Sequence, residues 1–172
     1  MTETGSGHTY RKHSKRDAFF AVLNGQAVAE TAPYKHGDTV TWFLRDQPGY
    51  LKKPAVEEEL TAALTAWAPA CGLVFEKAKV EAGAKIVFGF HGQDGDATYI
   101  FDGPGGCLAQ VVRAAEKGAG DGNGPAFIKF DEEEKWLLQG DAAAFGAFRL
   151  LPVAIHEVSE SIRNNAIYNI VT

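Results

Sequence analysis

The segment Ile155-His156-Glu157-Val158-Ser159-Glu160-Ser161-Ile162 is the most informative part of this sequence, because it has the pattern of a zinc-binding helix with one ligand replaced. In the intact pattern, two His residues four positions apart bind Zn²⁺ from one helix face, and the Glu after the first His is the general base. Here His156 and Glu157 fill the first two positions, and Glu160 stands where the second His would be. The helix therefore offers two zinc ligands, His156 and Glu160, whereas a catalytic zinc normally has three from the protein.

The same segment has a simpler structural interpretation. Because His156 and Glu160 are four residues apart, they would form an ordinary side-chain pair on a helix surface, with Glu157 bonded to a neighbouring strand or to solvent. No other His follows in the remaining residues of the sequence. We therefore expect Glu157 to be a vestigial base, unless a third ligand comes from elsewhere in the chain.

The composition indicates one globular domain. The chain has 172 residues, of which 45% are hydrophobic, and this is enough for a substantial core. A formal net charge of -5 argues against nucleic acid or an anionic membrane as a partner, although Arg11 to Arg16 form a local basic run that we expect to be a solvated arm.

The compartment follows from two further features. No apolar segment reaches membrane-spanning length, and residues 1–7 lack the layout of a secretory signal, so the sequence as written predicts a cytoplasmic protein, or a secreted one if a leader was removed. Cys71 and Cys107 are too few for a disulfide framework. We expect each cysteine to be a small buried apolar residue. A disulfide bond between the two is the alternative.

The chain alternates strand and helix patterns. Thr39 to Arg45 is β-rich and precedes a Pro-Gly turn. Pro54 then starts a helix that Pro69 and Gly72 end, with Glu57 to Glu59 in its first turn. The apolar positions of this helix recur at helical spacing: Val56, Leu60, Ala63, Leu64 and Trp67. Further strands are predicted at 73–76, 85–90, 107–113 and 126–130, followed by a helix around His156 in which Pro152 marks the first turn or a kink.

Four motifs in order resemble one family. They are Ala63-Leu64-Thr65-Ala66-Trp67 with Leu73-Val74-Phe75, Phe101-Asp102-Gly103-Pro104-Gly105-Gly106-Cys107-Leu108-Ala109, Phe130-Asp131-Glu132-Glu133-Glu134-Lys135-Trp136 and Val153-Ala154-Ile155-His156-Glu157. Over residues 38–161 the chain is similar to the catalytic domain of matrixins, the matrix metalloproteinases within the metzincins. The resemblance implies an α/β (α+β, zincin-like) fold with a five-stranded twisted mixed sheet, one antiparallel edge strand, two main helices and a truncated C-terminal subdomain. Residues 1–37 would be an N-terminal arm, partly packed, and 38–172 the matrixin-like domain.

The resemblance also implies a calcium site. Its ligands would be the side chains of Asp102, Asp131 and Glu134 and the carbonyls of Gly103, Gly105 and Cys107, all oxygen donors that suit Ca²⁺. The alternative is a solvated acidic turn beside a Gly-rich loop.

The family's structural zinc, in contrast, is not expected here. Its ligand positions hold the Asp94-Gly95-Asp96 region, Gln110 and Lys129. We expect the ammonium of Lys129 to replace the charge of the metal and to pair with Asp94 or Asp96.

The third His of the family's catalytic site and the Met beneath it are also missing. The leading hypothesis is therefore a catalytically disabled pseudoprotease, stabilised by Ca²⁺, that binds an extended peptide or protein along the edge strand at Leu108, Ala109, Gln110 and Val111. The first alternative is an active zinc metalloendopeptidase with a variant His-Glu-x-x-Glu site. The second alternative is a lectin-like or defence-type binding protein. Its only support is that the chain is compact and acidic and lacks a recognisable signal sequence. The sequence does not predict the oligomeric state.

Overall fold

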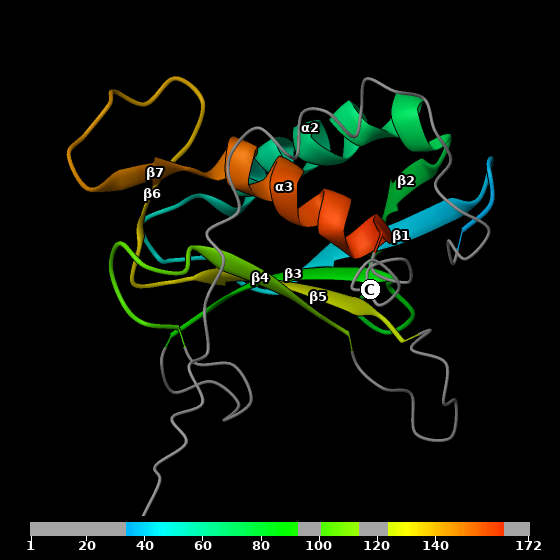
Figure 1. Ribbon diagram of the computed structural model, residues 1–172, viewed down its shortest axis with the longest axis horizontal. Helices are drawn as coiled ribbons and strands as arrows, with labels where there is room; N and C mark the ends of the chain where they lie inside the picture. The colour runs from blue at the N-terminus through cyan, green and yellow to red at the C-terminus, as the bar shows by residue number, and fades with distance from the viewer. Residues whose placement is uncertain (1–33, 93–100, 114–123, 164–172) are drawn as a thin grey trace, which may run out of the picture.

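The structure is a computed structural model that describes residues 34–92, 101–113 and 124–163. Within these residues a five-stranded sheet is covered on one face by two helices (Figure 1). The elements of this layer pair are β1 (Thr39–Leu44), α2 (Lys53–Cys71), β2 (Val74–Lys77), β3 (Ile86–His91), β4 (Ala109–Arg113), β5 (Ala126–Asp131) and α3 (Leu150–Arg163).

The strand order is β2-β1-β3-β5-β4. The first four strands in this order run parallel to their neighbours, and β4 is antiparallel to β5 at the edge of the sheet. This arrangement confirms the predicted mixed sheet with an antiparallel edge strand and two main helices. The predicted division at residue 37 stays a prediction, because residues 1–33 lie outside the described part of the chain.

Helix α2 forms where the apolar spacing predicted it. Pro54 is its second residue, where no intrahelical N–H donor is needed, and Gly72 ends it in the left-handed conformation at φ 67°. The prediction that Glu57 to Glu59 lie in the first turn is wrong, because the helix already begins at Lys53. Pro69 lies inside the helix, two residues before its end, so Gly72 alone terminates it.

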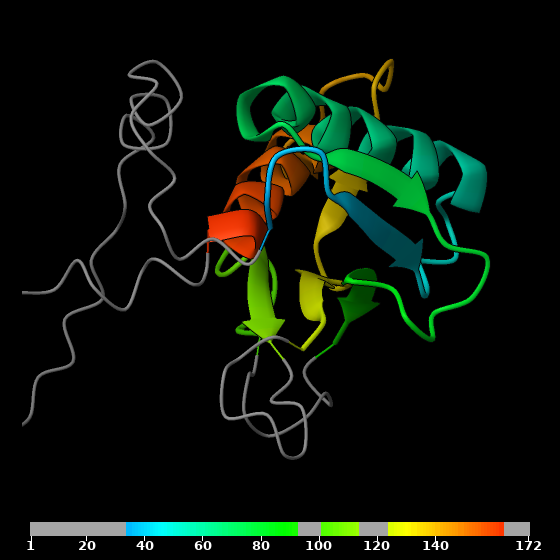
Figure 2. The same cartoon turned by 90° about the vertical axis from the view of Figure 1, so that its right-hand side faces the viewer.

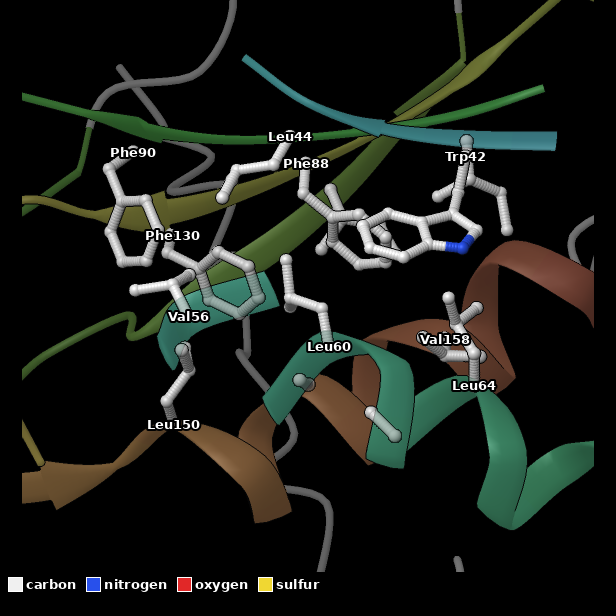
Figure 3. Packing of buried hydrophobic residues seen from close by; sticks show 14 of the residues in the cluster. Trp42, Leu44, Val56, Leu60, Leu64, Phe88, Phe90, Phe130, Leu150 and Val158 are labelled. Carbon is white, nitrogen blue, oxygen red and sulfur yellow. The ribbon is translucent and has the colours of Figure 1, made fainter. Parts of the chain in front are cut away.

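The core lies between the sheet and the helices (Figure 3). Large side chains of the sheet, among them Trp42, Phe88 and Phe130, point toward α2 and α3 and are at most 3% exposed. They meet Leu60 of α2 and Val158 of α3, both fully buried. Because burying a side chain of this size contributes about 1.5–3 kcal/mol, this layer fixes α3 on the sheet.

Helix α3 also has a polar anchor to α2. The indole Nε1 of Trp67 donates a hydrogen bond to the carbonyl oxygen of Ile155 at 2.7 Å. Ile155 immediately precedes His156, so this bond sets the position of the α3 segment that carries the zinc-helix pattern. Pro152 is the third residue of α3 and therefore lies in its first turn, the first of the two predicted alternatives.

A second, two-stranded sheet was not predicted. β6 (Lys135–Leu137) pairs in parallel with β7 (Ala147–Arg149) just before α3. The Arg149 guanidinium donates to the carbonyl oxygens of Leu138 and Asp141 at 2.8 Å each, and so closes the loop between the two strands. Figure 2 shows this loop beside the N-terminal end of α3.

We call the sheet face turned away from the helices the outer face. Because side chains alternate along a strand and Ile128 and Phe130 point into the core, Phe127 and Lys129 belong to the outer face. The same alternation places Gln110 of β4 and His91 of β3 there.

The described residues also bear on two expectations from the sequence, the one about membrane-spanning segments and the one about the two cysteines. No helix in the described residues is long and apolar enough to cross a membrane. Both Cys71 and Cys107 are free, Cys71 half-buried and Cys107 exposed. The predicted burial of Cys107 is wrong, because this residue lies in the surface loop before β4 rather than on a core-facing position.

Candidate functional site

Helix α3 holds its two functional candidates in different environments. It packs against β4 and β5, and this buries Glu157, whose side chain is 9% exposed, whereas the side chain of His156 is 50% exposed. The distance between His156 Nε2 and Glu157 Oε1 is 4.0 Å. The helix therefore places one imidazole at the surface beside one buried carboxyl group.

Burial raises the pKa of Glu157 from 4.5 to about 7, and the charge of Glu160 adds to the rise. The two carboxyl groups are three residues apart and lie on neighbouring positions of one helix face. The Glu157 carboxyl group therefore keeps its proton to a higher pH than an exposed glutamate does.

The described residues do not show the contacts that the simpler interpretation of this helix predicted. Among the described residues, the carboxylate oxygen within 4.0 Å of the His156 Nε2 belongs to Glu157 and not to Glu160. Glu157 does not face solvent, and the structure gives it no hydrogen bond within the described part of the chain. No group of three or more His, Cys, Asp and Glu side chains in residues 34–92, 101–113 and 124–163 is arranged to hold one metal ion.

The predicted calcium ligands come from two segments that the fold brings together. Asp102 Oδ1 accepts a hydrogen bond from the Cys107 backbone N–H at 2.7 Å, within the Gly-rich loop. Glu134 Oε1 accepts one from the Gly105 N–H at 2.5 Å and so joins this loop to the turn after β5. Gly103 and Gly105 have φ of 83° and 90°, a conformation that glycine adopts without strain.

Asp131 gives the strongest support for a cation at this place. Its side chain is fully buried; Oδ1 accepts the Glu133 N–H at 2.9 Å, but Oδ2 has no hydrogen-bond partner among the described residues. A buried unpaired carboxylate oxygen is costly unless a cation or a proton compensates it. The donor set of carboxylates and loop carbonyls therefore fits Ca²⁺, although Asp102 and Glu134 accept backbone N–H groups here rather than converge with Asp131.

Sequence reasoning missed Tyr50 in this region, and it did not predict a contact of the Cys107 thiol. The Tyr50 hydroxyl donates to the Glu134 carbonyl oxygen at 3.2 Å and accepts the Trp136 N–H at 2.9 Å, so it fixes the turn that carries Glu134. The Cys107 thiol donates to the Ala109 carbonyl oxygen at 3.4 Å. Although Cys107 as a residue is exposed, nearby protein atoms partly desolvate its thiol, and this desolvation, followed by the charges of Asp102 and Glu157, raises the pKa of the thiol. No local pattern indicates the Tyr50 contact, because Tyr50 is 84 residues from Glu134.

The edge strand has a defined set of outward-facing main-chain groups. The Asp131 N–H donates to the Leu108 carbonyl oxygen at 2.9 Å, and Gln110 opposes Lys129. Because hydrogen-bonded and non-bonded pairs alternate in an antiparallel ladder, Leu108 and Gln110 bond to β5, and the N–H and C=O groups of Ala109 and Val111 point to the free edge. Of the four predicted edge residues, Ala109 and Val111 therefore have backbone groups that a partner strand could bind.

The positions of the family's structural zinc lie on the outer face. Gln110 and Lys129 are direct partners in the β4–β5 ladder, and both are half-buried. Asp94 and Asp96 lie outside the described residues, so the predicted pairing with Lys129 stays a prediction.

Comparisons with known proteins agree on one family. A family model described as Matrixin matches residues 33–162. The chain is 29% identical to matrix metalloproteinase-20 of Homo sapiens over 94% of its own length and 36% of that protein. It is 38% identical to matrilysin of Felis catus, over 70% of this chain and 40% of that protein. With matrix metalloproteinase-26 of Homo sapiens the values are 27% identity, 72% of this chain and 43% of that protein, so the chain spans less than half the length of these relatives.

Proposed function

The chain belongs to the matrixin family, and on that premise we propose that it is a catalytically disabled metalloprotease-like domain that binds an extended peptide or protein segment along β4. The observation that supports the loss of catalysis most directly is the composition of α3. His156 and Glu160 are the two potential zinc ligands on this helix, and Glu160 replaces an imidazole with a carboxylate.

The binding function rests on the free edge of β4. In the described residues this strand pairs with β5 alone, so the backbone groups of Ala109 and Val111 are oriented to add a further strand. An extended segment would gain main-chain hydrogen bonds there without any metal. The partner is therefore proposed to be recognised by its extended backbone first and by its side chains second.

A structural Ca²⁺ is part of this proposal. Asp102, Asp131 and Glu134 with the carbonyls of Gly103, Gly105 and Cys107 would hold the ion between the Gly-rich loop and the end of β5. The unpaired Oδ2 of Asp131 supports it. When bound, Ca²⁺ would offset two of the three negative charges of these carboxylates and fix the loop that leads into β4.

The test of binding uses calorimetric titration against a library of unstructured peptides. We expect a binder with a Kd below 1 mM, and we expect Val111→Pro to weaken it at least tenfold, because proline removes an outward N–H group without removing a bond to β5. Gln110→Ala is the matched control, since it alters a side chain of the same strand and leaves the free edge intact. A library without any binder tighter than millimolar would contradict the proposal.

An active zinc metalloendopeptidase is the second candidate, and one observation favours it. A pKa of about 7 for Glu157 is suited to a general base at neutral pH. This candidate requires a third ligand in addition to His156 and Glu160, and it predicts stoichiometric zinc together with chelator-sensitive cleavage of casein that Glu157→Gln abolishes. Elemental analysis that finds no zinc in fully folded protein would exclude it.

A further inference from the structure

The outer face of the sheet has a polar row at the place where the family's structural zinc would be bound. Lys129 of β5 lies opposite Gln110 of β4 on one side and opposite Gly89 of β3 on the other. Side chains at directly opposed positions have Cβ atoms about 4.5–5.5 Å apart, close enough for two of them to bind one ion. At neutral pH, however, an ammonium group has no lone pair to donate, and an amide oxygen is a poor ligand for zinc.

His91 is the one imidazole that the described residues place on this face. It lies two residues beyond Gly89 on the same side of β3 and is half-buried. Burial lowers its pKa most, Asp46 opposes this effect, and the charges of Lys129 and Arg45 lower it further. Lys129 is therefore close enough to act electrostatically on His91.

The acidic groups near His91 do not complete a ligand set. Asp46 Oδ1 already accepts the Phe90 N–H at 2.7 Å, Glu132 lies beside Gly92 after β3, and Asp131, which opposes His91 in the β3–β5 ladder, belongs to the proposed calcium ligands. On the same face the charge of Arg45 is offset by its ion pair with Glu81, so it is the ammonium of Lys129 that would repel a dication beside His91.

We infer that Lys129 is a cation in the place of the family's structural zinc, and that this part of the sheet folds without a zinc ion between Gln110 and Lys129. The inference is independent of the proposed function, since it concerns neither α3 nor the free edge of β4. The inference rests on two observations. Gln110 and Lys129 are directly opposed in the β4–β5 ladder, where two ligand side chains could bind one ion. Neither of these side chains is a good zinc ligand.

The experiment restores the ligands. In a His156→Ala background, which removes the imidazole of α3, the double variant Gln110→His with Lys129→His would add two imidazoles beside the native His91. We expect the background protein to retain no zinc after dialysis, and the double variant to bind one equivalent. With Co²⁺, the double variant should give the visible absorption typical of tetrahedral coordination. Adding His91→Ala should weaken zinc binding at least tenfold.

Two outcomes overturn the inference. If the background protein itself retains one zinc that His91→Ala removes, the native face is a metal site. If the folded double variant binds no zinc, the side chains at 110 and 129 are not what excludes the metal. Lys129→Met gives an independent measurement, because it keeps the aliphatic length and removes the charge. We expect it to lower the thermal unfolding midpoint by several degrees in the presence of chelator, and an unchanged midpoint would contradict a structural role of the charge.

Discussion

Replacing Glu157 by Gln is expected to stabilise the protein at alkaline pH and to leave its stability nearly unchanged at acidic pH. Burial, together with the charge of Glu160, raises the pKa of Glu157 from 4.5 to about 7 in the folded state. Between these values the unfolded chain has released a proton that the folded chain still holds. The free energy of unfolding therefore falls as pH rises through this window, and the loss is complete above pH 7.

The size of the effect follows from the same shift. At about 1.4 kcal/mol per pH unit, the rise corresponds to about 3 kcal/mol of lost stability at pH 8. The side chain is 9% exposed, so solvent screens little of this energy. Glutamine has nearly the same shape and no charge, and it should recover most of the loss.

Urea denaturation at half-unit intervals from pH 4 to 8.5, with chelator present, measures this difference. The free energy of unfolding of Glu157→Gln should match that of the native chain near pH 4 and exceed it by about 3 kcal/mol at pH 8. Glu160→Gln should recover a smaller part, because its charge is the second cause of the shift. Glu76→Gln on the exposed side of β2 serves as the control. Parallel pH curves for the native chain and Glu157→Gln would refute the reasoning.

Three further predictions concern the calcium loop, the helix anchor and the helix end. Asp131→Asn should abolish the stabilisation by Ca²⁺, which at a free concentration of 100 times the Kd amounts to about 2.7 kcal/mol, and thermal unfolding with and without chelator measures it. Trp67→Phe should cost about 1 kcal/mol in urea denaturation, because it removes the hydrogen bond to the Ile155 carbonyl oxygen; an unchanged midpoint would show that this bond contributes nothing. Gly72→Ala should cost at least about 1 kcal/mol in the same assay, since its φ is 67° and a Cβ would overlap the His36 ring.

The sequence predicted the larger elements because their patterns are local. The apolar spacing from Val56 to Leu64 and the glycine at 72 suffice to define α2 without any tertiary information. The first-turn position of Glu57 to Glu59 was wrong for a related reason, since helix starts are poorly marked when the residue before them is a lysine without a capping side chain.

The features that the sequence did not reveal depend on contacts between distant residues. β6 and β7 are three residues each and have no periodicity that could be recognised before their pairing was known. The raised pKa of Glu157 arises from packing of α3 on the sheet, and a motif cannot report that burial. Glu59 shows the same limit, since it lies in a run of three Glu residues, yet it is buried and its Oε1 accepts the Gln139 N–H at 2.5 Å.

The parallel centre of the sheet has a consequence for how the protein is made. β1 pairs with β3, and β3 with β5, so each central contact joins strands about 40 residues apart in the chain. Trp42 and Phe88 therefore remain without their full packing on the ribosome until Phe130 has emerged. Refolding should take milliseconds to seconds, and the nascent N-terminal half should be a substrate for chaperones.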